Sequence, residues 1–196
     1  RISVSLIYAT KHYNPSEKRE DDVDKVCRSA HEALADVFDG ASVLFGGWGS
    51  VGVANTLIDA LHERGTRGIT VVVTGMGRVD PIMALLEAHQ VKKVISSFRV
   101  LGSTSLAERL NRFYREGGVE VEVVPQGTLA ERIRAGGAGI PAFFPPAGAG
   151  TLVERGKEKR VFRGKEYLLE EAITADFALV KAWRGDRFGN LVYRKG

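Results

Sequence analysis

The feature that most constrains the fold is a regular alternation of short apolar runs with helical patterns. Residues 69–74 read Ile-Thr-Val-Val-Val-Thr, which is typical of a strand buried on both faces. The predicted strands are residues 41–45, 69–74, 94–98, 119–124, 175–183 and 191–193. The predicted helices are residues 22–38, 53–63, 81–89, 106–115 and 129–134. This alternation favours an α/β fold with an open, mainly parallel sheet and flanking helices.

Composition indicates one sizeable globular domain. The 196 residues are 44% hydrophobic and 27% charged, which suits a single α/β domain over residues 23–196. An N-terminal arm, residues 1–22, precedes it; the arm begins with a short apolar stretch and turns polar at residues 12–22. The net charge of +4 is spread along the chain, so we expect no nucleic-acid partner. No apolar run approaches the roughly 18 residues of a membrane span, so we expect no membrane partner either.

Cysteine and histidine usage argues against disulfide and metal chemistry. Cys27 is the single cysteine, which excludes an intrachain disulfide and fits a reducing compartment. It lies in a helical pattern, and we interpret it as a small buried or half-buried side chain. The histidines at positions 12, 31, 62 and 89 are scattered without metal-ligand spacing, so we expect surface histidines and no metal site.

A glycine-rich segment follows the first predicted strand of the domain and precedes a helix. Residues 46–52 read Gly-Gly-Trp-Gly-Ser-Val-Gly, and residues 47–52 match the G-x-G-x-x-G spacing of a dinucleotide-binding turn. Against that interpretation, Trp48 is large for a tight turn, and the next strand carries no acidic residue at its end. Dinucleotide binding and plain tight packing both remain open here.

A second segment, residues 125–129, reads Pro-Gln-Gly-Thr-Leu between a predicted strand and a predicted helix. Open α/β sheets bind ligands at this point. Gln126 carries amide donors that could stabilise an oxyanion without adding charge. The alternative is a capping turn, with Thr128 near the N-cap and Glu131 three residues later. Spacing alone does not separate the two.

The region that follows is rich in glycine and proline. Residues 135–150 cannot form an ordinary helix or central strand, and their length favours a functional loop. After them, residues 161–162 and 167–169 flank a turn and predict a β-hairpin. Arg132 and Arg134, just before this region, could meet a phosphate, but a solvated helix face is the simpler interpretation. Trp48 and Trp183 are interpreted as packing residues.

Together these segments resemble family I coenzyme A transferases, specifically the α subunit or N-terminal half. Residues 39–54 follow the family's first signature, with its Asp-Gly, an apolar run, Gly-Gly and a later Gly. Residues 125–142, PQGTLAERIRAGGAGIPA, match the family almost letter for letter. Residues 148–153 and 169–190 also fit. The resemblance covers about residues 39–193.

The sequence departs from the family at several positions. Trp48 stands where the family has Phe, and Ala54 where it has Pro. Residues 73–75, Val-Thr-Gly, replace a Ser-Asn-Asn or Asn-Asp, and residues 100–102, Val-Leu-Gly, replace a Gly-Glu-Asn. The side of the site that binds the acyl group is therefore expected to differ from that of the relatives.

The resemblance implies an enzyme that moves CoA between an acyl-CoA and a carboxylic 3-oxo acid by ping-pong chemistry, as in fatty acid or ketone body metabolism. The family's nucleophilic glutamate lies in a Ser-Glu-Asn-Gly motif that this chain lacks, so a β subunit should supply it, in an α2β2 or similar assembly. Gln126 is implied to contact the acyl or oxyanion oxygen. CoA is a substrate, and no permanently bound cofactor is implied. The residues expected to line the cleft are Gly46, Gly47, Gly49, Gly52, Thr74, Gly75, Gly127, Gly136, Gly137 and Gly139.

Two alternatives stay open. The first is a CoA-transferase-like hydrolase or ring-opening enzyme that acts on an acyl-CoA with a partner that lacks the glutamate, and the second is a dinucleotide-binding module. The expected location is the cytoplasm, with the mitochondrial matrix as the alternative.

Overall fold

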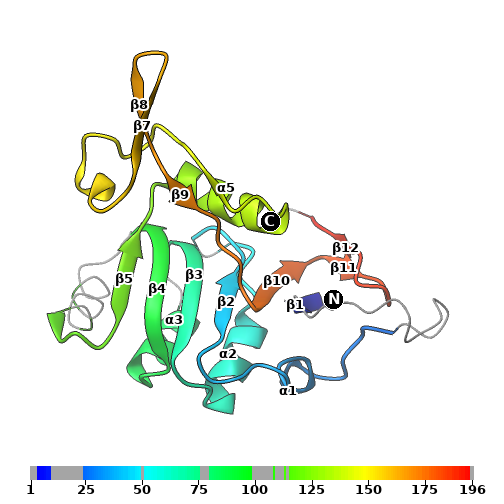
Figure 1. Ribbon diagram of the computed structural model, residues 1–196. Coiled ribbons are helices and arrows are strands. Elements are labelled where there is room, and N and C mark those ends of the chain that lie inside the picture. The colour runs from blue at the N-terminus through cyan, green and yellow to red at the C-terminus, as the bar shows by residue number, and fades with distance from the viewer. Residues whose placement is uncertain are drawn as a thin grey trace.

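The main sheet has six strands in the order β1-β10-β2-β3-β4-β5 (Figure 1). The computed structural model describes residues 4–9, 24–49, 51–75, 80–98 and 115–194, together with Glu108 and Phe113. The strands of this sheet are β1 (Val4–Ala9), β2 (Ser42–Phe45), β3 (Ile69–Gly75), β4 (Val91–Phe98), β5 (Glu120–Val123) and β10 (Phe177–Ala182). All neighbours pair in parallel except β1, which runs antiparallel to β10. The predicted α/β class with a mainly parallel sheet is confirmed.

Helices cover both faces of this sheet. The larger core lies on the face covered by α1 (Ala30–Ala33), α2 (Asn55–Arg64) and α3 (Asp80–Glu87). On the opposite face, alternate strand residues such as Val72 and Ile95 pack with Leu129 of α5 (Gln126–Gly137). Strand β3 in the middle of the sheet is therefore covered from both sides, which explains why its sequence is nearly continuously apolar.

One contact fixes the register between two strands that are far apart in sequence. The carboxylate of Asp176 accepts hydrogen bonds from the backbone and the hydroxyl of Ser42, at 2.8 and 2.7 Å. The Ser42 hydroxyl in turn accepts from the backbone N–H of Asp176 at 3.0 Å. These bonds from Ser42 lower the pKa of Asp176 below its ordinary value. These hydrogen bonds join the amino-terminal ends of β2 and β10, so the two parallel strands begin at the same edge of the sheet.

The predicted helix over residues 22–38 is wrong in most of its length. Among the described residues it is reduced to α1, four residues long. Before α1, the Asp24 carboxylate accepts from the backbone N–H of Val26, and Ser29 caps the helix at Ala30, so the side chains compete with helical bonding. After it, the carbonyls of residues 35 and 37 accept hydrogen bonds from the guanidinium of Arg64.

Two further expectations concern this amino-terminal part. Cys27 is exposed, so its interpretation as a buried or half-buried helical side chain is wrong. Partial burial of its sulfur atom and the charges of Glu32 and Asp24 raise its pKa, which disfavours a nucleophilic thiolate. The start of the predicted N-terminal arm, Val4–Ala9, pairs along β10 as an edge strand. The remaining residues of the arm lie outside the described residues.

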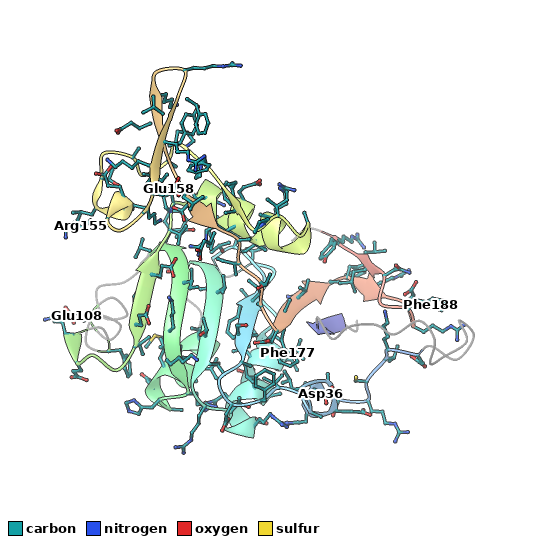
Figure 2. All side chains as sticks on the ribbon, viewed as in Figure 1. Asp36, Glu108, Arg155, Glu158, Phe177 and Phe188 are labelled. Carbon is teal, nitrogen blue, oxygen red and sulfur yellow. The ribbon has the colours of Figure 1, made fainter. Side chains whose placement is uncertain are left out.

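The glycine- and proline-rich region leads to a hairpin that projects away from the sheet (Figure 1). The smaller elements are β6 (Ala142–Phe143), a short 3-10 helix (Leu152–Glu154), β7 (Lys159–Phe162), β8 (Lys165–Leu168), β9 (Glu170–Glu171), β11 (Arg184–Gly185) and β12 (Leu191–Val192). The predicted hairpin is confirmed as the β7–β8 pair. In Figure 2 Arg155 and Glu158 lie near this hairpin, whereas Phe177 lies at the core face of the sheet, 5.9 Å from Phe38 between ring centroids.

Most of the predicted helix over residues 106–115 lies outside the described residues. Strand β4 begins at Val91, three residues before its predicted start. The prediction began too late because Lys92 and Lys93 interrupt the apolar pattern on which it rested. Among the helices of the described ranges, none is long and apolar enough to cross a membrane.

Candidate functional site

The topology brings most of the predicted site residues to one edge of the sheet. The strands β2, β3, β4 and β5 run parallel, so all of them end at this edge. Gly46 follows β2, Gly75 ends β3, Phe98 ends β4 and Gln126 lies just beyond β5. Because neighbouring strands lie about 4.8 Å apart, roughly 14 Å of sheet separates the glycine turn from Gln126. We call this row of strand ends the carboxyl edge; open α/β sheets bind their ligands there.

The glycine turn, residues 46–52, folds back on itself. Trp48 and Val51 each donate a backbone hydrogen bond to the other's carbonyl, at 2.9 and 3.0 Å. Gly47 has a φ of 114°, and a Cβ there would lie 2.9 Å from the carbonyl oxygen of Val51. Only glycine fits this crossing without a shift of the backbone.

This geometry argues against a dinucleotide-binding turn. In such a turn, backbone N–H groups point at the pyrophosphate and a helix begins at once. Here the amides of Trp48 and Val51 are used within the turn, and α2 begins only at Asn55, without a side-chain cap. The structure therefore favours the second interpretation of the glycine spacing, a tightly packed turn.

The turn is tied to the next strand. The Thr74 hydroxyl of β3 donates to the carbonyl of Gly47 at 2.9 Å. The Trp48 indole then reaches Phe98 at the end of β4, with ring centroids 5.7 Å apart and planes at 84°. Trp48 is nevertheless 55% exposed, so its interpretation as a packing residue holds only for the side that contacts Phe98. Trp183 is half-buried, with Arg194 5.0 Å above its ring.

Gln126 is the first residue of α5 and is exposed. The helix has Pro125 at its N-cap and no side-chain cap, so the first backbone N–H groups are not satisfied by a capping side chain. The predicted capping role of Thr128 is wrong, because Thr128 lies inside the first turn, 2% exposed. Gly127 has open space where a Cβ would stand. The amino end of α5 thus offers neutral hydrogen-bond donors at the carboxyl edge.

The predicted cleft residues Gly136, Gly137 and Gly139 lie at the other end of the same helix, about 15 Å from Gln126 at 1.5 Å per residue. A Cβ on Gly136 would lie 2.1 Å from the carbonyl oxygen of Ile173, so this glycine permits close packing. Gly139 has a φ of 71° and follows the C-cap, while Ile140 donates to Ala135 at 2.9 Å. Packing and helix termination account for two of these glycines, and their contact with substrate stays a prediction.

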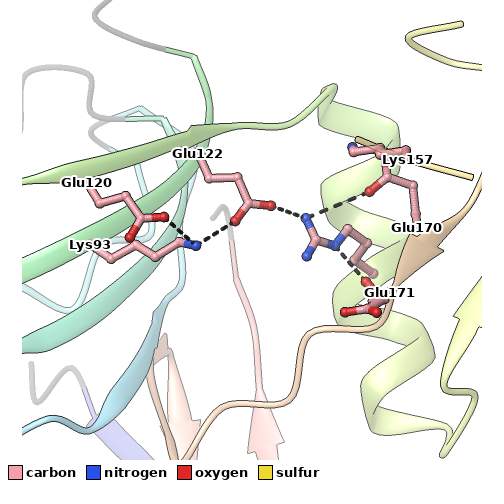
Figure 3. Close-up of polar contacts among 7 residues, drawn as sticks. Lys93, Glu120, Glu122, Lys157, Glu170 and Glu171 are labelled. Carbon is pink, nitrogen blue, oxygen red and sulfur yellow. Dashed lines mark hydrogen bonds and ion pairs between the residues drawn. The ribbon is translucent and has the colours of Figure 1, made fainter. Parts of the chain in front are cut away.

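A chain of ion pairs joins the sheet to α5 and the hairpin region, and sequence reasoning missed it (Figure 3). Its members are Lys93, Glu120, Glu122, Arg132, Lys157, Glu170 and the carbonyl of Glu171. The central Arg132 is 12% exposed in its side chain and lies 2.6 Å from Glu122, so the solvated-face interpretation is wrong for it. Arg134 is exposed and pairs with Glu131 at 2.7 Å, as expected for a solvated face.

Within this chain of ion pairs, the hydrogen bonds of Lys93 and Glu122 shift their pKa values in the directions that favour their charged states. Burial acts to raise the pKa of Glu122, but hydrogen bonds from Arg132 and Lys93 outweigh it and hold this pKa below its ordinary value. Glu170 is 2% exposed and pairs with Lys157. In the sequence, glutamates alternate with valines over residues 119–124, which indicates a strand with one polar face but does not identify the partners of those glutamates. The network positions α5 on the sheet and so places Gln126.

Metal binding finds no support in the part of the chain that the structure describes, which holds no group of three metal-ligating His, Cys, Asp or Glu side chains. His31 is exposed and pairs with Glu63 at 3.1 Å, and Nδ1 of His62 donates to Oε1 of Gln90 at 2.7 Å. His89 is exposed. His12 lies outside the described residues.

Comparison with known proteins defines the family. The sequence profile of the coenzyme A transferase family matches residues 27–196. The chain is 44% identical over 174 residues to the A subunit of succinyl-CoA:3-ketoacid coenzyme A transferase from Helicobacter pylori, covering 88% of this chain and 73% of that protein. It is 46% identical over 174 residues to the A subunit of 3-oxoadipate CoA-transferase from Acinetobacter baylyi, covering 88% and 75%.

A solved structure shows the same fold. Glutaconate coenzyme A-transferase from Acidaminococcus fermentans superposes with a TM-score of 0.73 at 16% identity, over 86% of this chain and 60% of that one. The family match and the two relatives cover most of this chain, and the resemblance seen in its sequence is confirmed. The chain belongs to the coenzyme A transferase family.

Proposed function

We propose that this chain is the A subunit of a heteromeric CoA-transferase that moves CoA between an acyl-CoA and a 3-oxo acid. The observation that carries the proposal is the identity of 44% and 46% to two relatives named as A subunits of such transferases, over 88% of this chain. One relative is named for 3-ketoacids and the other for 3-oxoadipate, so both names specify 3-oxo acids. The carboxyl edge, with Gln126 and the glycine turn, is the proposed contribution of this chain to the site.

The proposed chemistry is ping-pong and needs a second subunit. In the first step a glutamate of the partner attacks the acyl-CoA carbonyl, and CoA thiolate leaves, which forms an acyl-glutamyl anhydride. The thiolate then attacks the glutamyl carbonyl, releases the first carboxylate and leaves a glutamyl-CoA thioester. An acceptor carboxylate reverses both steps. This chain contains no Ser-Glu-Asn-Gly sequence, which supports placing the nucleophile on the partner.

Each attack passes through a tetrahedral intermediate whose oxygen carries negative charge. Gln126 is proposed to donate its side-chain amide to that oxygen. A neutral donor at an uncapped helix start suits this task, because it stabilises developing charge without pairing permanently with the ground-state carboxylates. CoA is then a substrate, and no permanently bound cofactor is proposed. The assembly is proposed to be α2β2 or similar, in the cytoplasm or the mitochondrial matrix; the single cysteine fits either reducing compartment.

A second candidate is an acyl-CoA hydrolase or ring-opening enzyme of the same family. The observation in its favour is the Val-Thr-Gly at residues 73–75, which stands in place of the Ser-Asn-Asn or Asn-Asp expected from the family resemblance. The Thr74 hydroxyl is already donated to Gly47, so this strand end offers substrate less hydrogen bonding than an asparagine would. In this alternative the partner lacks the glutamate.

The deciding experiment uses the chain coexpressed with its B subunit. The purified heteromer is incubated with succinyl-CoA and a 3-oxo acid, and acyl-CoA products are separated by chromatography and identified by mass. Formation of 3-oxoacyl-CoA together with a CoA-sized adduct on a glutamate of the partner supports transfer. Release of free CoA without a new acyl-CoA contradicts transfer and supports hydrolysis.

Gln126→Ala is expected to lower kcat by on the order of 10²–10³, because one oxyanion donor is lost. The free energy of unfolding should stay unchanged, since Gln126 is exposed. Arg134→Ala is the matched control on the same helix, where the exposed side chain pairs with Glu131, and its turnover should stay within about twofold of the parent. Equal turnover of Gln126→Ala and the parent would contradict the proposed role of Gln126 as a donor to the oxyanion.

A further inference from the structure

The β7–β8 hairpin is a two-stranded sheet with solvent on both of its faces. All residues of β7 and the first two of β8 are exposed, and Leu168 at the base is the one buried residue of these two strands. In Figure 1 the hairpin extends away from the main sheet. A lone pair of strands is at best marginally stable in water, because it buries little apolar surface. The hairpin would therefore gain stability from a partner that covers it.

The turn of the hairpin holds an arginine in an unfavourable backbone conformation. Arg163 has a φ of 51° and Gly164 has a φ of 76°. Two left-handed residues form the tight turn that suits the twist of a hairpin, but asparagine or glycine usually occupies the first position. A side chain that is kept in a strained conformation at an exposed tip points to a use for that side chain.

Apolar side chains lie on both faces of the hairpin. On one face Phe162 packs edge-on against Phe144 and Tyr167, with ring centroids 5.7 and 5.4 Å apart. Phe162 is nevertheless 45% exposed, and Val161, which points to the opposite face, is 63% exposed. Because the rings are already in place, a partner can bury them at a low cost in conformational entropy.

The hairpin region, residues 152–168, carries most of the net charge of the chain. It has six lysines and arginines against three glutamates, which is three of the four net positive charges. Each of these glutamates already lies within 4.0 Å of a lysine or arginine of the same region. The excess positive charge favours an acidic partner. A twofold contact between the hairpins of two copies would bring like charges together, so the charge favours a different chain.

The position and size of the hairpin point to the B subunit. Lys157, just before β7, pairs with Glu170, whose carboxylate lies 3.9 Å from the guanidinium of Arg132 on α5. Helix α5 begins at Gln126 at the carboxyl edge, and in Figure 1 the hairpin lies beyond α5 as seen from the sheet. Strands of four residues cover roughly 14 Å by 10 Å, much less than the roughly 800 Å² that a stable interface buries on each partner. The hairpin is therefore one part of a larger contact, and the B subunit is the partner proposed to reach the carboxyl edge.

We propose that the β7–β8 hairpin docks onto the B subunit, with Phe162 in an apolar pocket and Arg163 against an acidic patch beside it. This inference rests on the proposed function, which supplies the partner. It assigns the hairpin to subunit assembly and leaves the chemistry to the carboxyl edge.

The test uses the heteromer coexpressed with its B subunit and diluted in steps, and sedimentation gives the dissociation constant of the two chains. Phe162→Ala should raise this constant about tenfold or more, as expected for a buried aromatic anchor. Arg163→Gly should raise it roughly threefold to tenfold and make it less dependent on salt. Because glycine suits a φ of 51°, the unfolding midpoint of the Arg163→Gly A subunit should stay equal to that of the parent or rise. Lys92→Ala, which removes an exposed cation near the amino end of β4, is the control and should change the constant by less than about twofold.

A photoreactive benzoylphenylalanine in place of Phe162 identifies the chain that the hairpin contacts. A cross-link to the B subunit supports the inference, whereas a cross-link only to a second A subunit, or none, overturns it. Equal dissociation constants for the parent, Phe162→Ala and Arg163→Gly overturn it as well. These measurements need no turnover, so a heteromer that docks through the hairpin but transfers no CoA contradicts the proposed chemistry alone. Failure of the two chains to assemble contradicts the proposed function, and the inference with it.

Discussion

Two glycine-rich segments of the chain, residues 46–52 and residues 136–139, look alike in the sequence and differ in the structure. The first lies at the carboxyl edge and folds into a turn that holds Trp48 in solvent. The second ends α5, where Gly136 lies against the backbone of Ile173. Both were predicted to line a substrate cleft. The comparison shows that glycine marks a constraint on the backbone, and that the neighbours decide whether the constraint serves a site or the packing of a helix.

The largest expected effect tests the packing role of Gly136. In Gly136→Ala the new Cβ would lie 2.1 Å from the carbonyl oxygen of Ile173, so the helix and the segment that contains Ile173 must separate. We expect a loss of about 3 kcal/mol or more in the free energy of unfolding, measured with urea. Gly137→Ala is the matched control, because nothing lies within 4 Å of its Cβ, and it should be neutral or slightly stabilising. Equal free energies of unfolding for Gly136→Ala and Gly137→Ala would contradict the packing role of Gly136 and, with it, the contrast between the two glycine-rich segments.

A smaller effect is expected at the glycine turn. Gly47→Ala forces a φ of 114° on alanine and brings its Cβ to 2.9 Å from the carbonyl oxygen of Val51. We expect a loss of roughly 1–3 kcal/mol in the free energy of unfolding. Gly49→Ala has a φ of 58° and open space, so it should lose only about 1 kcal/mol. At a temperature where the Gly47→Ala and Gly49→Ala heteromers are both folded, Gly47→Ala should also lower the rate of CoA transfer. Full transfer activity of Gly47→Ala would place the glycine turn outside the site.

The smallest expected effect concerns how α5 is held by charge. The folded-state pKa of Glu122 lies below its ordinary value of 4.5, so this carboxylate stabilises the fold above about pH 4.5. That contribution is lost as pH falls through the lowered pKa. In Glu122→Gln the decline of the free energy of unfolding between pH 6 and pH 3 should therefore be shallower than in the parent. The exposed Glu116 gives the control Glu116→Gln, whose pH profile should overlay that of the parent.

Much of the fold could be predicted because the central strands of its sheet are covered on both faces. Runs such as residues 69–74 are compatible with one kind of element only, and β2, β3 and β10 followed from the sequence with small shifts of their ends. The failures have local causes. At residues 22–38 the apolar spacing is helical, but the side chains of Asp24 and Ser29 accept hydrogen bonds from nearby backbone N–H groups. The Arg64 guanidinium donates hydrogen bonds to the carbonyls of residues 35 and 37. The bonds of Asp24 and Ser29 are local, whereas those of Arg64 come from another helix, α2, and the periodicity of apolar residues reports neither.

The candidate site was predictable in its position and less so in its details. That Gln126 and the glycine turn lie at one edge follows from parallel strands ending together. Sequence spacing could not show that Gly136 and Gly139 lie a helix length away from Gln126, or that Trp48 is exposed. It also missed the role of Arg132, whose partner Glu122 lies ten residues earlier on β5 and whose partner Glu170 comes from β9, far along the chain. These features depend on what the fold places opposite each residue.

Strand β5 closes one side of the main sheet, and among the described strands none of that sheet pairs with its outer backbone groups. It is only four residues long and carries Glu120 and Glu122, one of them 68% exposed in its side chain. Short, charged edge strands resist the addition of a foreign strand, because a second copy would bring like charges together. The same glutamates that bind Lys93 therefore also protect the free chain against aggregation through its sheet edge. That protection matters most before a newly made chain meets its partner.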